Sequence, residues 1–422
     1  MAPKPVGEVL DTVDRQMDET VEALQELVRI PSVTGNENVA QAHMADLLGG
    51  AGLEVEVFTP TRAEVADHPS FSDDGLALGE RPVVIGRARV ATGPVVVLNG
   101  HIDVVPPGDE DRWHHPPWSG TVDDGAVWGR GSCDMKGGLI AGWAALRAIA
   151  SVGCDLDVSI VFASVIGEET GGVGTLSSIQ RGHVGDAAIV LEPTRGEICP
   201  IGAGALSFEV EIEGKAAHGA MRQHGVSAID KFRVVLDALE TLETDRNQRF
   251  DHPLFRSGDL TAPLSVGVLS AGDWISTVPE RLVAAGRYGV LPGESVAEAR
   301  AEFERRVEDS TADDEWLSEH PPMVRWVEGQ FAPAETSVDS PLVTALRKAH
   351  SAVVGGNVGL HGVPYGSDQR FYVNDAQMDA VLYGPGDVRH AHTIDERVPI
   401  ADVSQVAKVV AATLLQWDSG NT

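Results

Sequence analysis

The strongest indication of the fold is the segment 95–103, which reads Val-Val-Val-Leu-Asn-Gly-His-Ile-Asp. Four successive apolar residues indicate a β-strand that is buried on both faces, as strands of parallel sheets are. The run ends at His101 and Asp103, whose two-residue spacing puts both side chains on one side of an extended chain. Because ligands of α/β sheets gather at the carboxyl ends of strands, this segment predicts a buried strand that ends in a binding site.

Further apolar runs repeat this arrangement along the chain. Residues 158–165 and 187–191 form such runs, and Glu168-Glu169 and Glu192 follow them within a few residues. Residues 135–150 have the pattern of a helix between two of the strands. Buried strands that alternate with helices predict an α/β domain with a mainly parallel sheet. We also expect helices over 8–29, 36–51, 340–353, 367–374 and 400–417, a strand over 380–383, and an irregular acidic excursion over 60–90.

The pattern changes near residue 202. Residues 206–212 alternate apolar and polar side chains, which is typical of a half-exposed antiparallel strand. Helices near 225–243 and 295–309 and strands near 264–269 and 281–290 complete a β-α-β-β-α-β-like block. We therefore predict an inserted α+β, ferredoxin-like domain over 202–332, and a first domain made of 1–201 and 333–422.

Composition limits the classes of function. The chain has 422 residues, of which 43% are hydrophobic, and this is enough for two cores. A formal net charge of −31 argues against nucleic acid or an anionic membrane as a partner, since like charges repel. Three scattered cysteines argue against a disulfide framework and favour a reducing, cytoplasmic compartment. The sequence shows neither a signal peptide nor an apolar stretch long enough to span a membrane.

The residues at the strand ends predict metal chemistry. His101 is a candidate metal ligand, and Asp103 is expected to accept a hydrogen bond from the other ring nitrogen. Asp134 lies in a glycine-dense turn, where its two oxygens can reach two metals at once. The alternatives for Asp134 are a helix cap or a phosphate-binding loop, but the glycine spacing matches neither phosphate motif. Its neighbour Cys133 is expected only to pack there.

The acidic pair Glu168-Glu169 and a histidine near the C-terminal end of the sequence extend this predicted site. One carboxylate of Glu168-Glu169 can bind a cation while the other serves as a general base, although a solvated acidic turn is the commoner fate of such a pair. A carboxylate at the position of Glu192 is costly to bury unless it is paired or ligates a metal, and it can alternatively reach solvent. Between His390 and His392, we favour His392 as a ligand and His390 as its neighbour.

These segments, in this order, resemble the metallopeptidase family M20, and in particular its acetylornithine deacetylase and succinyl-diaminopimelate desuccinylase branch. The resemblance implies a zinc-peptidase-like catalytic domain and an inserted lid domain through which two copies form a homodimer. It rests on segments that span nearly the whole chain: Arg29-Ile30-Pro31-Ser32, Gly100-His101-Ile102-Asp103, Gly131 to Gly137, Gly167-Glu168-Glu169, Leu191-Glu192-Pro193-Thr194 and Ala391-His392.

The resemblance also implies roles for individual residues. One divalent metal would be held by His101, Asp134 and Glu192, and a second by Asp134, Glu169 and His392, with Asp134 as the bridge. Zinc is the expected metal, with cobalt or manganese as alternatives. Glu168 would be the general base for a water that both metals share, and Asp103 would orient His101.

Residues outside the metal ligands are assigned by the same resemblance. His218, in Gly214-Lys215-Ala216-Ala217-His218-Gly219, would stabilise the oxyanion. Arg287 would grip a substrate carboxylate, because its planar guanidinium meets a carboxylate with two parallel hydrogen bonds. Gly366 and Ser367 would line the substrate pocket.

The leading hypothesis is a di-metal hydrolase that removes an acyl group from a small N-acylated amine or amino acid. One alternative is a dipeptidase or carboxypeptidase with the same catalytic residues. Another is a deformylase of a formyl-aminopyrimidine, whose substrate would lack the carboxylate expected for Arg287. A non-catalytic binding protein would require the loss of a ligand or of the base, and none is lost here.

Overall fold

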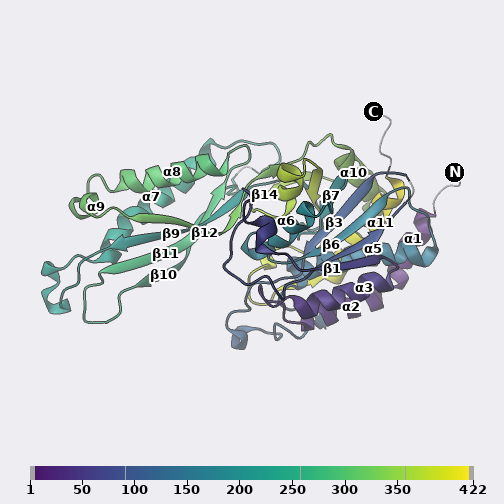
Figure 1. Cartoon of the computed structure of the whole chain (residues 1–422), viewed down its shortest axis with the longest axis horizontal. Helices are drawn as coiled ribbons and strands as arrows, with labels where there is room; N and C mark the ends of the chain where they lie inside the picture. Colours follow the sequence, from purple (N-terminus) through teal and green to yellow (C-terminus); the bar gives the residue numbers. More distant parts are fainter. Residues whose placement is uncertain (1–4, 91, 257, 357, 418–422) are drawn as a thin grey trace. The chain divides into compact units, whose positions relative to one another are not determined.

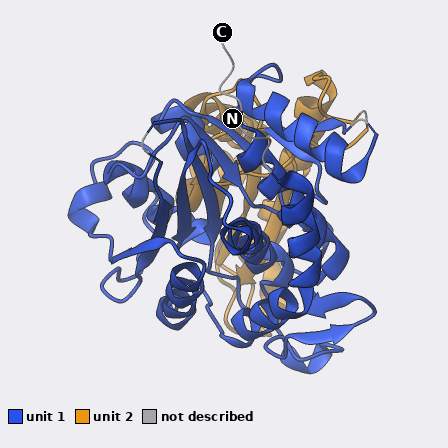
Figure 2. Ribbon diagram, turned by 90° about the vertical axis from the view of Figure 1, so that its right-hand side faces the viewer, with its two compact units in different colours: residues 1–200, 335–361, 368–422 blue, residues 201–334, 362–367 orange. Residues whose placement is uncertain are grey.

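The computed structural model describes residues 5–90, 92–256, 258–356 and 358–417. The chain forms two compact units, which Figure 2 colours separately. Unit 1 contains residues 1–200, 335–361 and 368–422, and unit 2 contains residues 201–334 and 362–367. The segment 362–367 was predicted to belong to the first domain, whereas the structure groups it with unit 2. Within the described ranges, every helix is too short or too polar to cross a lipid bilayer.

Unit 1 is built on a nine-stranded sheet in the order β1-β2-β6-β3-β7-β15-β8-β13, with β14 paired to β8. The four central strands β6, β3, β7 and β15 are parallel, as predicted, and antiparallel strands flank them on both sides. The strands are β1 (Glu54–Phe58), β2 (Val83–Ala88), β3 (Val95–His101), β6 (Ser159–Val165), β7 (Ala187–Val190), β8 (Ile198–Gly202), β13 (Ala334–Glu335), β14 (Leu360–Val363) and β15 (Asp379–Leu382).

Helices surround this sheet (Figure 1). Helices α1, α5, α10 and α11 pack against one another, and α5 also contacts β3. A small second sheet has the order β16-β5-β4 and contains β4 (Thr121–Asp123), β5 (Ala126–Trp128) and β16 (Arg397–Pro399). The helices of unit 1 are α1 (Val6–Arg15), α2 (Met17–Arg29), α3 (Asn38–Gly50), α4 (Arg62–Val65), α5 (Gly137–Val152), α6 (Val173–Gln180), α10 (Pro341–Val354) and α11 (Ile400–Gln416).

Three predicted elements of unit 1 were wrong in detail. The helix expected over 8–29 is two helices, because the backbone leaves helical geometry at Gln16 (φ −97°, ψ 7°). The excursion expected over 60–90 contains the buried strand β2, whose apolar run is only three residues long, Val83 to Ile85, and lies between charged residues in the sequence. The helix expected over 367–374 is mainly a π-helical turn, Phe371–Asp375, next to polar side chains that are buried against other segments.

Unit 2 is an antiparallel sheet in the order β10-β11-β9-β12, with two long helices lying side by side on one face (Figure 1). This is the predicted β-α-β-β-α-β arrangement. Its core lies between the helices and the sheet and includes Phe208, Leu239, Tyr288 and Phe303. The elements are β9 (Gly204–Glu213), α7 (Ala228–Arg249), β10 (Leu264–Ala271), β11 (Arg281–Val290), α8 (Val296–Ser310), α9 (Glu315–Glu319) and β12 (Met323–Phe331).

Candidate metal centre

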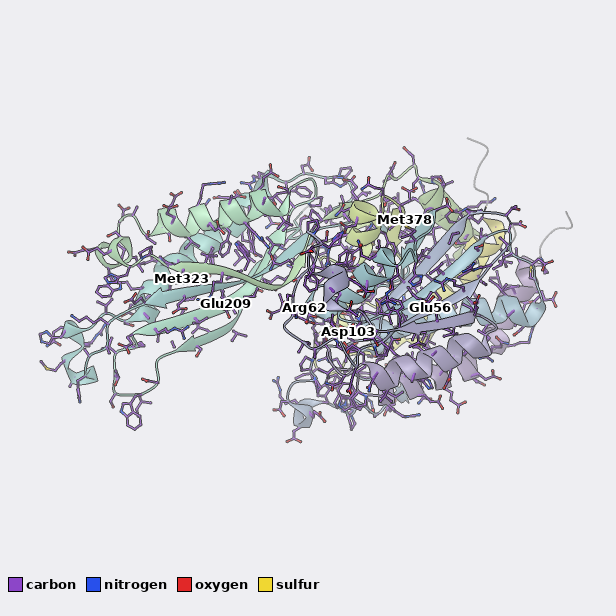
Figure 3. All side chains as sticks on the ribbon, in the orientation of Figure 1. Glu56, Arg62, Asp103, Glu209, Met323 and Met378 are labelled. Carbon is purple, nitrogen blue, oxygen red and sulfur yellow. The ribbon has the colours of Figure 1, made fainter. Side chains whose placement is uncertain are left out.

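The parallel strands of unit 1 bring the predicted ligands to one edge of the sheet. Strand β3 ends at His101, and its neighbours β6 and β7 end shortly before Glu168-Glu169 and Glu192. Carboxyl ends of adjacent parallel strands meet at the same edge, which explains why residues so far apart in sequence converge. Asp103, just after β3, marks this region in Figure 3.

His101, Asp134 and Glu192 form the first group. Nε2 of His101 lies 3.1 Å from Oδ1 of Asp134 and 3.9 Å from Oε1 of Glu192. One ligand atom of each residue lies within 4.8 Å of the other two. All three side chains are at least largely buried, and the histidine is only 1% exposed.

Asp134, Glu169 and His392 form the second group. Nε2 of His392 lies 3.3 Å from Oδ2 of Asp134 and 3.0 Å from Oε2 of Glu169. Asp134 therefore turns one carboxylate oxygen to each group, which is the geometry of a bridging ligand. His390, which was expected to be a neighbour only, belongs to neither group.

The electrostatics of the two groups fit a pair of cations. Burial, reinforced by the neighbouring Asp134, raises the pKa of Glu192 well above its usual range. Burial opposes protonation of His392, but Glu169 and Asp134 outweigh it and raise its pKa to about 11. An excess of buried carboxylates attracts positive charge, and the nitrogen and oxygen donors lie at the spacing that metal–ligand bonds of about 2.0–2.2 Å require. The residues present thus fit two divalent ions that share Asp134.

Asp103 acts differently from the prediction. Nδ1 of His101 is 2.8 Å from the backbone carbonyl of Asp103 and 3.8 Å from its carboxylate, so the carbonyl is the hydrogen-bond acceptor. The carboxylate instead accepts the backbone N–H groups of Glu168 and Glu169 at 3.2 and 3.3 Å. Asp103 therefore fixes the ring of His101 with its main chain and the acidic pair with its side chain.

The turn that carries Asp134 is held by a residue that the sequence analysis missed. Oε1 of Glu396 accepts the N–H groups of Cys133 and Asp134, both at 3.0 Å, and Oε2 accepts a hydrogen bond from Arg130 at 2.6 Å. Glu396 is fully buried. The alternative role of Asp134 as a helix cap does not apply, because α5 begins at Gly137 and no side-chain cap bond is formed there. The only signal for Glu396 in the sequence was its position four residues after His392.

Lys136 and Cys133 are buried beside the same turn. Nζ of Lys136 donates to the carbonyls of Leu27 and Ile30 at 3.0 and 2.9 Å, which ties the turn to the end of α2. Burial lowers the pKa of Lys136 to about 7. Burial also raises the pKa of Cys133, so it is a protonated thiol that packs in the interior.

A second polar group that the sequence analysis missed lies behind the acidic pair. Asp368 is fully buried and accepts a 2.5 Å hydrogen bond from the hydroxyl of Thr175. Arg370 is also buried and donates to the carbonyl of Gly171, which follows the acidic pair in the same turn. Burial raises the pKa of Glu168 well above its usual range, and the neighbouring Glu192 and Asp368 add to this effect against the opposing influence of His101.

The remaining predicted residues belong to unit 2. His218 is exposed, and its Nδ1 accepts the N–H of Ala220 at 3.1 Å. Arg287, on β11, donates to the carbonyls of Pro263 and Pro364 at 3.3 and 2.8 Å. Gly366 and Ser367 lie in the segment 362–367, and a Cβ at Gly366 would approach Phe331 to 2.3 Å. Unit 2 thus holds the four residues predicted for the substrate, and unit 1 holds the residues predicted as metal ligands.

Comparisons with known proteins agree with this architecture. The model of peptidase family M20/M25/M40 matches residues 97–416. A succinyl-diaminopimelate desuccinylase from Methylobacterium nodulans is 32% identical over 418 residues, covering 94% of this chain and 96% of the relative. An N-formyl-4-amino-5-aminomethyl-2-methylpyrimidine deformylase from Halalkalibacterium halodurans is 28% identical over 339 residues, covering 76% and 79%.

The fold is also found in solved structures. A di-peptidase from Saccharomyces cerevisiae superimposes with a TM-score of 0.79 at 16% identity, covering 99% of both chains. At this identity the likeness concerns the fold alone. It agrees with the mixed α/β unit and the antiparallel unit described above.

Proposed function

We propose that this chain, which belongs to peptidase family M20/M25/M40, hydrolyses the amide bond of a small N-acylated amine or amino acid. Membership of the family makes the protein a hydrolase of amide bonds, and the class of substrate is the proposal. The observation that carries it is the pair of ligand groups that share Asp134, with the buried carboxylate of Glu168 in the same turn as one ligand.

The metals are assigned to the two groups as the sequence predicted. His101, Asp134 and Glu192 would hold one ion, and Asp134, Glu169 and His392 the other. We propose zinc, because two histidines and three carboxylates are ligands it accepts, although cobalt and manganese accept them too. When bound, such a pair supplies Lewis acidity that activates a water and polarises the scissile carbonyl.

Glu168 is the proposed general base. Its backbone N–H is held by Asp103, and its raised pKa suits a group that must keep a proton between two steps. It would take a proton from the attacking water and deliver it to the amide nitrogen as the C–N bond breaks. The products are the free amine and the carboxylic acid of the acyl group.

His218 is the proposed stabiliser of the oxyanion. Because its Nδ1 accepts the N–H of Ala220, the neutral ring carries its proton on Nε2. The ring then offers a hydrogen-bond donor, which is what a developing negative charge on the carbonyl oxygen needs.

The contacts of Arg287 bear on the substrate. Two of its nitrogens are already bonded to backbone carbonyls, so it has fewer donors left for the carboxylate that an N-acyl amino acid carries. This favours, as a second candidate, a substrate without a carboxylate, such as a formyl-aminopyrimidine like that named for the Halalkalibacterium relative. Gly366 and Ser367, which follow Pro364 in the same segment, would line the substrate pocket in either case.

We further propose that unit 2 forms a homodimer. Strand β10 is an edge strand with exposed Val268 and Leu269, and Trp274 and Ile275 after it are 69% and 99% exposed. An edge strand beside exposed apolar side chains is suited to association with a second copy. Ile275→Lys should shift the protein to monomers in analytical ultracentrifugation, and an unchanged mass would contradict this interface.

We propose the cellular compartment from the cysteines and the classes of partner that are excluded from the net charge. Three free cysteines, two of them buried, suit the reducing cytoplasm. The net charge of −31 argues against nucleic acid and anionic membranes as partners.

The function is tested with a panel of amides and a matched variant. Metal-reconstituted protein and Glu168→Gln are assayed on N-acetyl, N-formyl and N-succinyl amino acids, a formylated aminomethylpyrimidine and several dipeptides. Turnover of one acyl class that falls by about 10²–10⁴-fold in Glu168→Gln supports the proposal. Turnover of dipeptides alone supports a peptidase instead, and equal rates for the two proteins would rule out Glu168 as the base.

A further inference from the structure

Among the residues that the structure describes, a third group of side chains that could ligate a metal lies in unit 1, outside the residues used above. His114, His115 and Asp123 each place one ligand atom within 4.8 Å of the other two. The ligand atoms in each of the two groups of the dinuclear centre also lie within 4.8 Å of one another. The catalytic proposal gives these three residues no role.

The backbone around this group is held in place by its own hydrogen bonds. The indole N–H of Trp128 on β5 donates to the carbonyl of Asp123 at 2.9 Å, which fixes the end of β4. The N–H of His114 donates to the carboxylate of Asp395 at 2.7 Å. The ring of His115 packs edge-on against the rings of Trp128 and His114, with centroids 5.0 and 4.6 Å apart. The two histidines and the aspartate are therefore presented by ordered backbone.

The spacing of the donor atoms suits a small divalent ion. Nε2 of His115 lies 3.2 Å from Oδ2 of Asp123. Two ligands of a tetrahedral ion with bonds of about 2.0–2.1 Å lie roughly 3.4 Å apart, so little movement is needed. A simple hydrogen bond between His115 and Asp123 accounts for this distance as well, but it gives no reason for the second imidazole beside the pair.

We infer that His114, His115 and Asp123 bind a divalent ion of the zinc, copper and nickel class. Two imidazoles and one carboxylate are donors that these ions prefer, whereas calcium and magnesium prefer oxygen donors alone. Asp123 is 56% exposed and His115 is 18% exposed, so water can complete the coordination. The charge of −31 on the chain favours the approach of a cation.

The ion would act on the structure of the catalytic domain. Asp395, which holds His114, lies between the metal ligand His392 and the buried Glu396. An ion bound by His114, His115 and Asp123 would therefore stabilise the loop 114–123 against the segment that contains Asp395 and His392. This inference does not rest on the proposed substrate or on hydrolysis.

The test counts ions on the full chain. Protein is stripped with a chelator and dialysed to equilibrium against a series of Zn²⁺ concentrations, and bound zinc is measured by elemental analysis. Wild type is compared with His115→Ala, Asp123→Asn and the control His224→Ala, which removes an exposed histidine outside any such group. We expect wild type and His224→Ala to bind one more ion per chain than the other two variants. Equal stoichiometry in all four proteins would overturn the inference.

A spectroscopic readout identifies the ligands. Cu²⁺ is added below stoichiometry to protein loaded with only two zinc ions per chain, and electron paramagnetic resonance reports the nitrogen donors. Coupling to two nitrogens in wild type, lost in His115→Ala and retained in His224→Ala, supports the site. The same spectrum in both variants would contradict it. Circular dichroism and thermal unfolding verify that each variant is folded.

Discussion

The metal centre of unit 1 and the sheet of unit 2 are both rich in charge, but they accommodate it in opposite ways. Glu168 and Glu192 are buried with other carboxylates around them, and the pKa of each is raised. On the sheet of unit 2, Glu211 lies between Arg281 and Arg325 on the neighbouring strands, where water reaches all three side chains. Acidic residues thus indicate a binding site where the fold buries them without enough cations of its own, as at the metal centre. Where they are paired at the surface, each pair adds at most about 1 kcal/mol to stability.

The largest effect is expected where one carboxylate serves both groups. Asp134→Asn removes the charge that the two ligand groups share, so both ions should be lost along with hydrolysis. The loss of metal affinity should exceed the roughly 10–100-fold that is typical of residues that only support ligands. Elemental analysis and the amide assay measure it, with the exposed Asp339→Asn as control. A variant that keeps both ions and its activity would show that the charge of Asp134 is not needed to hold them.

Arg246 extends the comparison to unit 2, because it is a buried charge that is paired with carboxylates of opposite sign. Its guanidinium is buried, bonds to Glu294 and Glu302, and stacks on Tyr288. Arg246→Met should lower the free energy of unfolding of unit 2 by about 3–5 kcal/mol, because it leaves Glu294 without its cation, although Glu302 keeps Arg249 as a partner. Hydrogen exchange of amides in α7 and β11 measures this change. Metal content should not change, and a loss below about 1 kcal/mol would mean that the network contributes little.

Glu396 tests whether a residue that holds the turn of Asp134 in place affects metal affinity. Glu396→Gln keeps one acceptor oxygen but removes the charge that pairs with Arg130 and draws in two backbone N–H groups. We expect metal affinity to fall by about 10–100-fold while the protein stays folded. Metal dissociation constants measure the effect, and the exposed Glu80→Gln should leave them unchanged. Equal affinities for wild type and Glu396→Gln would show that Asp134 is held by its own turn.

The convergence of the candidate ligands was predictable because their positions follow from the strands. His101, Glu169 and Glu192 each come at or just after a buried apolar run, so a parallel sheet brings them to one edge. The two units and their element order were predicted from periodicity in the same way. Short strands such as β4, β5 and β16 were not predicted, because each has only three residues and depends on its partners.

The supporting residues were not predictable in this way. Glu396, Asp368 and Arg370 look like ordinary surface residues in the sequence, and they are buried only because distant segments cover them. The contact of Asp103 with His101 was predicted, but the accepting group was assigned to the carboxylate, because the spacing of two residues does not tell a side-chain acceptor from a backbone carbonyl. Such contacts depend on tertiary packing and not on local pattern.

The smallest effect is expected at the exposed pairs of unit 2. Hydrogen bonds from Arg281 and Arg325 lower the pKa of Glu211 to about 2, below its ordinary value of 4.5. A lowered pKa stabilises the folded state above pH 4.5, and this contribution is lost as the pH falls toward 2. Solvent screens these pairs, so Glu211→Gln should shift the unfolding midpoint only slightly at pH 7, and less still in 1 M salt. Denaturant unfolding at pH 7 and near pH 2, each in low salt and in 1 M salt, measures this shift. A shift at pH 7 as large as that of Arg246→Met would mean that surface charge in unit 2 is structural, and the contrast between the two regions would fail.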